Sequence, residues 1–315
     1  MRVATAQSHE SSTASAIRAA FDAIVDELGG APDWLLVQSA IRHEPEALRS
    51  ALVSVGARRV HGASSCLGVM SQAGVDTAGG LGMFGIRDAR GSFGVGMAAL
   101  DDDPAAAAGA ALQQAIDAAD RQGELPALIW LSASPGHEEA CIAGIEAMLG
   151  QGVPIVGGSA ADDSVAGDWY LLTLDANLGD AVVVTALYPS TALHSAFQSG
   201  YAPTNERGRV TASEGRTLIS IDGEPAAAVY DAWTDGAIAA ARPAGGNILA
   251  STTLFPIGRR VGELAGVAYY RLAHPESVTP EGALRLFADV AVGDELVLIR
   301  GTSEALRTRA GRVAA

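Results

Sequence analysis

The chain contains one order of elements twice: helix, buried strand, helix, strand, then further strands. The first run predicts helices over 11–30 and 43–56 and strands over 33–40, 57–65, 80–86 and 92–100. The second run predicts helices over 101–123 and 137–152 and strands over 126–134, 153–163, 169–175 and 180–188. Strands that alternate with amphipathic helices are typical of an α/β fold.

The two runs also agree in register. His43-Glu44 corresponds to His137-Glu138 at an offset of 94, and Gly62 corresponds to Gly158 at an offset of 96. The agreement favours an internal duplication over two generic α/β units that resemble each other by chance. We therefore predict an α/β protein with an internally duplicated N-terminal domain over residues 1–195.

The last third does not continue the repeat. It predicts strands over 217–223, 247–259, 266–273, 284–290 and 294–301, a helix starting near Glu224-Pro225, and a terminal helix over 302–315. We expect a smaller α+β domain over residues 196–315, with the boundary near Ala196.

Composition excludes several classes of function. The formal net charge of −15 repels phosphate backbones and anionic membrane surfaces, so we expect neither a nucleic-acid nor a membrane partner. All basic side chains are arginine, which excludes a Schiff-base lysine and a P-loop lysine. The two cysteines are too few for a disulfide framework. With no leader pattern and no apolar run of about 18 residues, the sequence predicts a cytoplasmic protein.

Loops rich in serine and glycine follow the strands of both runs, over 39–43, 62–68, 132–137 and 157–163. Ligands of α/β sheets bind outside the carboxyl ends of strands, so two copies related by a pseudo-twofold axis would present these loops to one pocket. Hydroxyls and free backbone amides suit a small zwitterion or carboxylate, with Asp162 or Asp163 pairing with an ammonium group. The candidate ligand-binding residues are Ser39, His43, Gly62, Ser64, Ser65, Cys66, Ser132, Ser134, His137, Gly157, Gly158, Ser159 and Asp162.

The residues around Cys66 disfavour catalysis, and the spacing of the histidines disfavours a metal site. A nucleophilic cysteine needs a base, but His61 falls on the opposite face of the strand from Cys66, and Cys66 corresponds to Asp162 in the second run. No two histidines have the spacing of a helical metal site. We predict no catalytic residue and no metal site. His43 and His137 either contact the ligand or begin their helices.

Five segments together resemble the FIST-domain family, whose members pair an N-terminal and a C-terminal FIST region. They are "HGASSCLG", "VPIVGGSAADD", "GRVTASEGRTLISIDGEPAAAVYDAW", "FPIG" and "VGDELVLIRGTSEAL". The resemblance implies that residues 1–195 are the FIST N-like ligand-binding domain and residues 196–315 the FIST C-like domain. Relatives continue to a final strand segment with a cysteine, so the C-terminal domain is expected to be shortened here.

The resemblance also implies a function. Family members are sensory proteins of signal transduction that bind a small molecule, such as an amino acid, and signal through a partner protein. One branch binds haem and senses nitric oxide beside a histidine kinase, which leaves haem as an alternative, with His61, His194 or Cys66 as axial ligand. A hydrolase or transferase that uses Cys66 or Ser65 is the alternative from another class.

Overall fold

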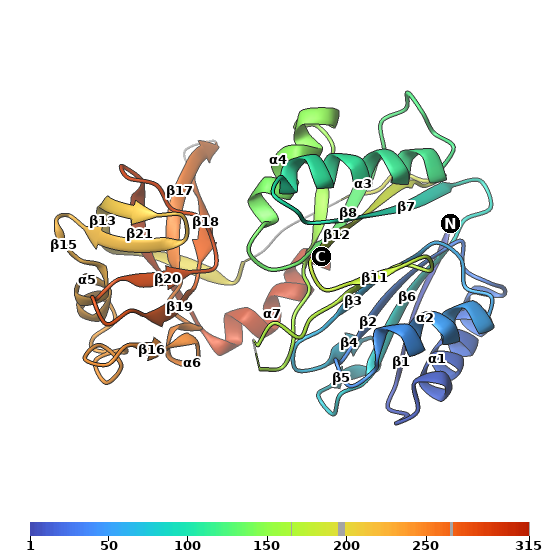
Figure 1. Cartoon of the computed structure of the whole chain (residues 1–315), viewed down its shortest axis with the longest axis horizontal. Helices are drawn as coiled ribbons and strands as arrows, with labels where there is room; N and C mark the ends of the chain where they lie inside the picture. The colour runs from blue at the N-terminus through green and yellow to red at the C-terminus, as the bar shows by residue number, and fades with distance from the viewer. Residues whose placement is uncertain (165, 195–198, 265–266, 315) are drawn as a thin grey trace. The chain divides into compact units, whose positions relative to one another are not determined.

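The computed structural model describes residues 1–164, 166–194, 199–264 and 267–314. Its contacts divide the chain into two compact units, Met1–Ser195 and Ala196–Ala315, at the boundary expected from the sequence. Figure 1 labels the elements of both units. Helices and strands alternate in the first unit, and the chain has the predicted α/β class.

The first sheet of the N-terminal unit has the strand order β1-β6-β2-β3-β10-β11. Strands β2 and β3 run parallel, and the other neighbours are antiparallel. Helices α1 (Thr13–Leu28) and α2 (Pro45–Ser54) pack their apolar faces against this sheet. The strands are β1 (Arg2–Ser8), β2 (Trp34–Ser39), β3 (Val60–Ser64), β6 (Leu81–Arg87), β10 (Leu171–Leu172) and β11 (Asn177–Leu178).

The second sheet has the order β7-β12-β8-β9, with β8 and β9 parallel and the other neighbours antiparallel. Helices α3 (Pro104–Ala118) and α4 (Glu138–Leu149) cover one of its faces. The strands are β7 (Ser92–Ala99), β8 (Leu128–Ala133), β9 (Ile155–Ser159) and β12 (Ala181–Tyr188).

The first four strands of the first sheet thus have the same order and directions as the strands of the second. Two assignments from the sequence need correction in this unit, and in the C-terminal unit the strand predicted over 247–259 is wrong, because the range contains a short helix over Leu249–Thr252. Strand β1 was not predicted, because its core-facing residues are the small Ala4 and Ala6. Strand β7 was assigned to the first run, yet it pairs with β12 and opens the second sheet. A common origin of the two halves stays a prediction.

The two sheets pack face to face, with helices on the outer side of each, as Figure 1 shows. Trp34 of β2 lies 5.9 Å from Trp130 of β8 between ring centroids, and its indole N–H donates to Thr185 Oγ1 of β12 at 3.2 Å. Both tryptophans were predicted to lie in the core. They fill the space between the two sheets.

A further hairpin, β4 (Val69–Ser71) with β5 (Gly74–Asp76), forms a two-stranded sheet of its own. Its strands are three residues long and were not predicted from the sequence. Gly68, at φ 117, enters the hairpin so close to Asp76 that an added Cβ would lie 1.8 Å from the Asp76 carbonyl oxygen. A glycine is therefore required where the hairpin begins.

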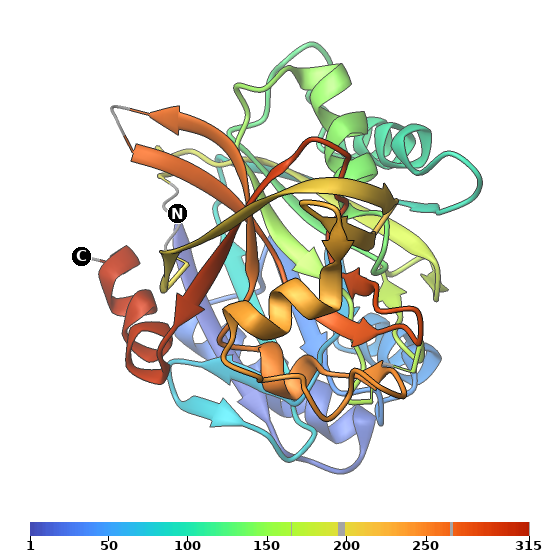
Figure 2. The same ribbon diagram turned by 90° about the vertical axis from the view of Figure 1, so that its left-hand side faces the viewer.

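The C-terminal unit is built on a nine-stranded antiparallel sheet of order β16-β19-β20-β14-β13-β21-β17-β18, with β15 beside β14. Its core is closed by α5 (Ala226–Trp233), which lies across the strands in Figure 2. The strands are β13 (Tyr201–Glu214), β14 (Thr217–Ile221), β15 (Glu224–Pro225), β16 (Gly246–Asn247), β17 (Ile257–Leu264), β18 (Val267–Ala273), β19 (Pro275–Val278), β20 (Leu284–Leu286) and β21 (Glu295–Gly301). Helices α6 (Leu249–Thr252) and α7 (Ser303–Ala314) complete the unit.

Candidate functional site

The four loops expected around the pocket come together, but they bond directly to one another. The backbone N–H of Ser65 donates to the carbonyl of Ser39 at 2.9 Å. The N–H of Ala161, in the second half, donates to the carbonyl of Ser64 at 3.2 Å. Leu67 N–H donates to Asp163 Oδ1 at 2.5 Å. The loops therefore join the two halves through hydrogen bonds between protein groups.

The four predicted serines that end strands or follow them are buried and have partners in the protein. Ser39 Oγ bonds to the Tyr170 hydroxyl, and Ser64 Oγ accepts from the Tyr170 N–H at 3.0 Å. Ser132 Oγ bonds to His61 Nε2 at 2.8 Å. Ser134 Oγ donates to the Gly179 carbonyl at 2.7 Å. These hydroxyls stabilise the contact between the halves.

Asp162 uses its carboxylate to organise its own loop. The carboxylate is buried and accepts from the N–H groups of Ser164, Ala166, Gly167 and Asp168 at 2.8, 3.0, 2.9 and 3.1 Å. Burial raises the pKa of Asp162, but the hydrogen bonds from its loop outweigh burial and lower that pKa to about 2. An ammonium group would have to compete with these donors, so the geometry does not favour the predicted ion pair.

His43 and His137 do not occupy equivalent places. His43 is fully buried, its Nδ1 bonds to Thr13 Oγ1 at 3.1 Å, and burial followed by the charge of Arg42 lowers its pKa. His137 is exposed and is the N-cap residue of α4, without a side-chain cap bond. The interpretation of His137 as a helix-starting residue fits this position, whereas His43 belongs to the interior.

The predicted glycines serve packing. Leu172 of β10 covers Gly62, where an added Cβ would lie 3.0 Å from the leucine side chain. Gly157 and Gly158 line a small hollow of about 160 Å³ beside α4, and Ser159 Oγ bonds to Glu138 Oε1 of the same helix. The loop of the second half thus interacts with its own helix.

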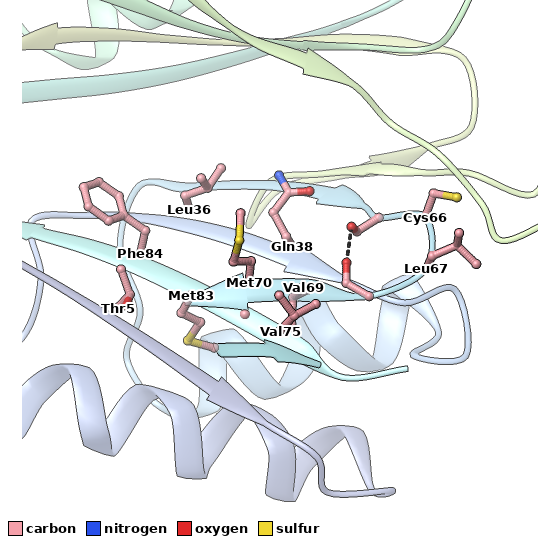
Figure 3. A pocket seen from close by; sticks show the side chains of 13 residues that line it. Thr5, Leu36, Gln38, Cys66, Leu67, Val69, Met70, Val75, Met83 and Phe84 are labelled. Atoms are coloured by element: carbon pink, nitrogen blue, oxygen red, sulfur yellow. Dashed lines mark hydrogen bonds between the residues drawn. The ribbon is translucent and has the colours of Figure 1, made fainter. Parts of the chain in front are cut away.

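The structure places a groove of about 420 Å³ on the first sheet instead. Its floor is formed by β1, β2 and β6, and its wall by the 65–68 loop and the β4–β5 hairpin. Figure 3 shows the side chains of Leu36, Gln38 and Phe84 along one side of the groove and the hairpin residues Met70 and Val75 below them. The lining comprises residues 65–70 and 82–84 together with Thr5, Leu36, Gln38 and Val75. Of the thirteen predicted site residues, Ser65 and Cys66 lie here.

Two polar side chains in the groove have no hydrogen-bond partner among the described residues. Thr5 Oγ1 is buried and unpaired, and no bond involves the side-chain amide of Gln38. The other lining side chains are apolar or small, and none is charged. The sequence did carry a signal for Gln38, because it follows Trp34 and Leu36 at every second position of a buried strand.

The hairpin wall holds apolar side chains exposed at the mouth of the groove. Met70 is 76% exposed and its cross-strand partner Val75 is 66% exposed. Bonds to β1 hold the hairpin in place: Ser71 Oγ donates to Gln7 Oε1, and Gln72 Nε2 donates to the Thr5 carbonyl, each at 2.9 Å. The groove therefore has a fixed wall with an apolar rim.

The groove contains no activated nucleophile among the described residues. Burial, then the charges of Asp163 and Asp162, raises the pKa of the Cys66 thiol, which keeps it protonated near neutral pH. Ser65 Oγ donates to the Gly68 carbonyl at 2.6 Å, an acceptor that does not remove its proton.

The proposed haem ligands do not fit a haem. His61 is fully buried between the sheets, where Nδ1 bonds to Thr185 Oγ1 at 2.9 Å and Nε2 to Ser132 Oγ at 2.8 Å. Burial lowers its pKa to about 3. Neither nitrogen is free for iron without the loss of a bond across the interface. His194 is exposed, and the pKa of Cys66 is raised where a thiolate ligand needs it lowered.

The described residues hold neither a metal-binding cluster nor a membrane-spanning helix. No group of three or more His, Cys, Asp or Glu side chains lies close enough to hold a metal ion in that part of the chain. In the same residues, no helix has the length and apolar character to cross a membrane.

Comparison with known proteins gave one family match. The family model for the FIST N domain matches residues 33–224. A search of curated proteins found no match. Among solved structures, the chain is similar to a cyanuric acid hydrolase from A. caulinodans at 11% identity, with 67% of this chain and 71% of that chain covered and a TM-score of 0.33. A second cyanuric acid hydrolase, described as an evolutionary innovation by structural concatenation, has 10% identity, coverages of 85% and 84% and a TM-score of 0.29. These two likenesses are too weak to bear on function.

Proposed function

This chain belongs to the FIST family of small-ligand-binding sensory domains, and we propose that its N-terminal unit binds a small molecule in the groove on the first sheet. In this proposal the protein acts in the cytoplasm and has no catalytic activity of its own. Occupancy of the groove is passed to a partner protein, such as a histidine kinase.

The observation that carries the proposal is the lining of the groove. A volume of about 420 Å³ falls in the range of small-molecule pockets, which are mostly apolar with a few placed polar groups. The apolar floor and rim meet this description, and Thr5 and Gln38 supply the polar groups. A buried hydroxyl without a partner costs free energy in the empty protein, and a ligand that bonds to it recovers that cost.

The ligand that fits best is an uncharged molecule with an apolar body and one amide or carboxamide end. The Gln38 side chain offers two donors and an acceptor, which pair with an amide in complementary fashion. Sequence alone favoured a small polar molecule such as an amino acid. In this groove a zwitterion would bury both charges without a counter-charge, which costs free energy.

Signalling requires that the ligand favour one arrangement of the protein over another. We expect ligand binding to change the environment of the β4–β5 hairpin, because Met70 and Val75 are exposed at the mouth of the groove. A ligand with an apolar body covers these side chains. The partner protein would then recognise the covered or the uncovered rim.

The absence of catalysis rests on Cys66 and Ser65. A protonated thiol and a hydroxyl bonded to a carbonyl both lack the activation that a hydrolase or transferase needs. Haem-based sensing is disfavoured by the two occupied nitrogens of His61. Turnover that Cys66→Ser abolishes while melting is unchanged would favour the enzyme, and a Soret band in the purified protein would favour haem.

The test is a thermal-shift screen with a panel of uncharged primary and secondary amides, followed by calorimetry on the amide with the largest shift. Bound ligand raises stability by about 2.7 kcal/mol at a hundredfold excess over Kd. We expect Gln38→Leu to weaken binding about tenfold, because a paired amide loses its partner. Gln122→Leu, the same change on an exposed residue outside the groove, is the matched control. Equal affinities of the two variants would place the site elsewhere.

A further inference from the structure

A row of charged and aromatic side chains crosses four strands of the C-terminal sheet. Arg209 of β13 is the cross-strand partner of Glu295 of β21, and Arg260 of β17 is the partner of Tyr270 of β18. Arg259 is opposite Leu296, so the next residue, Arg260, lies beside Glu295. The order across the sheet is therefore Arg209, Glu295, Arg260, Tyr270.

Glu295 holds the two arginines of this row. Its Oε1 lies 3.4 Å from an Arg209 nitrogen and its Oε2 lies 3.7 Å from an Arg260 nitrogen. One carboxylate thus positions two guanidinium groups on the same face. Arg209 also donates to the Gly293 carbonyl at 3.0 Å, and Arg260 to Glu263 Oε2 at 2.9 Å. A guanidinium carries five N–H donors, so each arginine keeps donors that these partners do not use.

A third arginine lies on the same face without a partner. Arg207 precedes Arg209 by two residues, so both side chains project from one side of β13. No ion pair or hydrogen bond engages the Arg207 side chain among the described residues. Opposite it on the strand beyond β21 is Gly258, where an added Cβ would lie 2.7 Å from the Ile299 side chain, so Ile299 packs against this glycine.

These residues line a hollow of about 360 Å³, which we call the arginine hollow. Its charged lining is Arg207, Arg209, Arg260, Glu295 and Asp222. Asp222 Oδ1 already accepts from the Arg209 backbone N–H at 3.0 Å. Glu263, outside the lining, pairs with Arg260 at 2.9 Å, so Arg207 is the guanidinium of the hollow that has no ion pair among the described residues.

We propose that the arginine hollow binds a small molecule with a phosphate group. Guanidinium groups bind phosphate through paired N–H donors, and two of the three here are already oriented by Glu295. The unpaired Arg207 supplies the charge that Glu295 does not neutralise. The Tyr270 hydroxyl, which also lines the hollow, donates a further hydrogen bond. This site lies in the C-terminal unit and the groove in the N-terminal unit. The hollow is proposed to bind an anionic ligand, whereas the groove is proposed to bind an uncharged one.

The experiment is calorimetric titration of the full chain with inorganic phosphate, against sodium chloride at the same ionic strength. We expect saturable binding of phosphate. Arg207→Gln should weaken it about tenfold, because one charge-assisted contact is lost. Arg207 has no partner within the described part of the chain, so the melting temperature of this variant should equal that of the parent.

Arg285→Gln is the matched control, because it removes the same charge from an exposed position of β20 outside the hollow. We expect it to bind phosphate like the parent chain. The proposal is overturned if the parent shows no saturable binding. It is overturned equally if Arg207→Gln binds like the parent, or if both variants lose affinity to the same degree, which would indicate a response to overall charge.

Discussion

The two sheets of the N-terminal unit share strand order and directions but differ in their additional hairpins. In the first half, β4–β5 stays beside its own sheet and forms the wall of the groove. In the second half, β10 leaves its own sheet and pairs with β3 of the other. A repeated backbone therefore does not repeat a site, because the site depends on where the added segment packs.

The two units of the chain differ in charge as well. Residues 1–195 carry 23 Asp and Glu against 9 Arg, whereas residues 196–315 carry 13 against 12. The proposed ligands follow the local lining of each site and not the net charge of its unit, because the groove is lined by uncharged side chains and the hollow by three arginines.

The largest effect is expected in the loop of the second half. At Gly157, φ is 145 and an added Cβ would lie 1.8 Å from the Leu131 carbonyl oxygen, whereas nothing lies within 4 Å of one at Gly158. We expect Gly157→Ala to lower the free energy of unfolding by about 3 kcal/mol or more and Gly158→Ala to change it by less than about 0.5 kcal/mol. Chemical denaturation measures both. Similar values would show that this loop adapts freely.

The next largest change in the free energy of unfolding is expected at the neighbouring aspartates Asp162 and Asp163. Asp162→Asn should lower the free energy of unfolding by about 3 kcal/mol, because several N–H donors lose a charged acceptor. Asp163→Asn should cost about 1 kcal/mol, because Asp163 accepts from Leu67 alone among the described residues. If Asp163→Asn lowered the free energy of unfolding more than Asp162→Asn, the bond between Asp163 and Leu67, which joins the two halves, would stabilise the loop more than the bonds within it.

The same pair predicts a pH dependence. The pKa of folded Asp162 is about 2, below its ordinary 3.8. Its carboxylate therefore stabilises the fold fully above pH 3.8, and this contribution is lost as the pH falls through about 2. The difference in stability between the parent and Asp162→Asn should shrink over this window in acid-denaturation curves. A difference that is constant with pH would contradict the assignment.

Smaller changes in stability are expected at two threonines, one in each sheet. Thr5 of β1 has a buried hydroxyl that finds no partner among the residues the structure describes, whereas Thr185 of β12 bonds to Trp34 and His61. We expect Thr5→Val to stabilise the empty protein by about 1 kcal/mol and to weaken amide binding, and Thr185→Val to destabilise it by about 2 kcal/mol. Thermal melts with and without the amide test both. Loss of stability in Thr5→Val would mean that its hydroxyl is satisfied.

Periodicity and end signals predicted the alternating elements and the inward position of Trp34 and Trp130. They could not predict the groove, because it depends on a hairpin with three-residue strands that no periodic pattern marks. The serines of the strand-end loops were predicted to line a ligand pocket between the halves, and they lie at the junction of the halves. Their hydroxyls were assigned to a ligand because sequence does not show that Tyr170, His61 and the Gly179 carbonyl pack against them.

The chain offers a direct measurement of the central claim, that the ligand binds in the groove. Cys66 is exposed at the groove, and Cys141, the other cysteine, lies on the buried face of α4. The native protein should therefore show one reactive thiol toward an alkylating reagent. A saturating amount of the amide selected in the screen should slow the alkylation of Cys66 in proportion to occupancy. An unchanged rate at saturation, with the melting temperature raised by the same amide, would contradict the account.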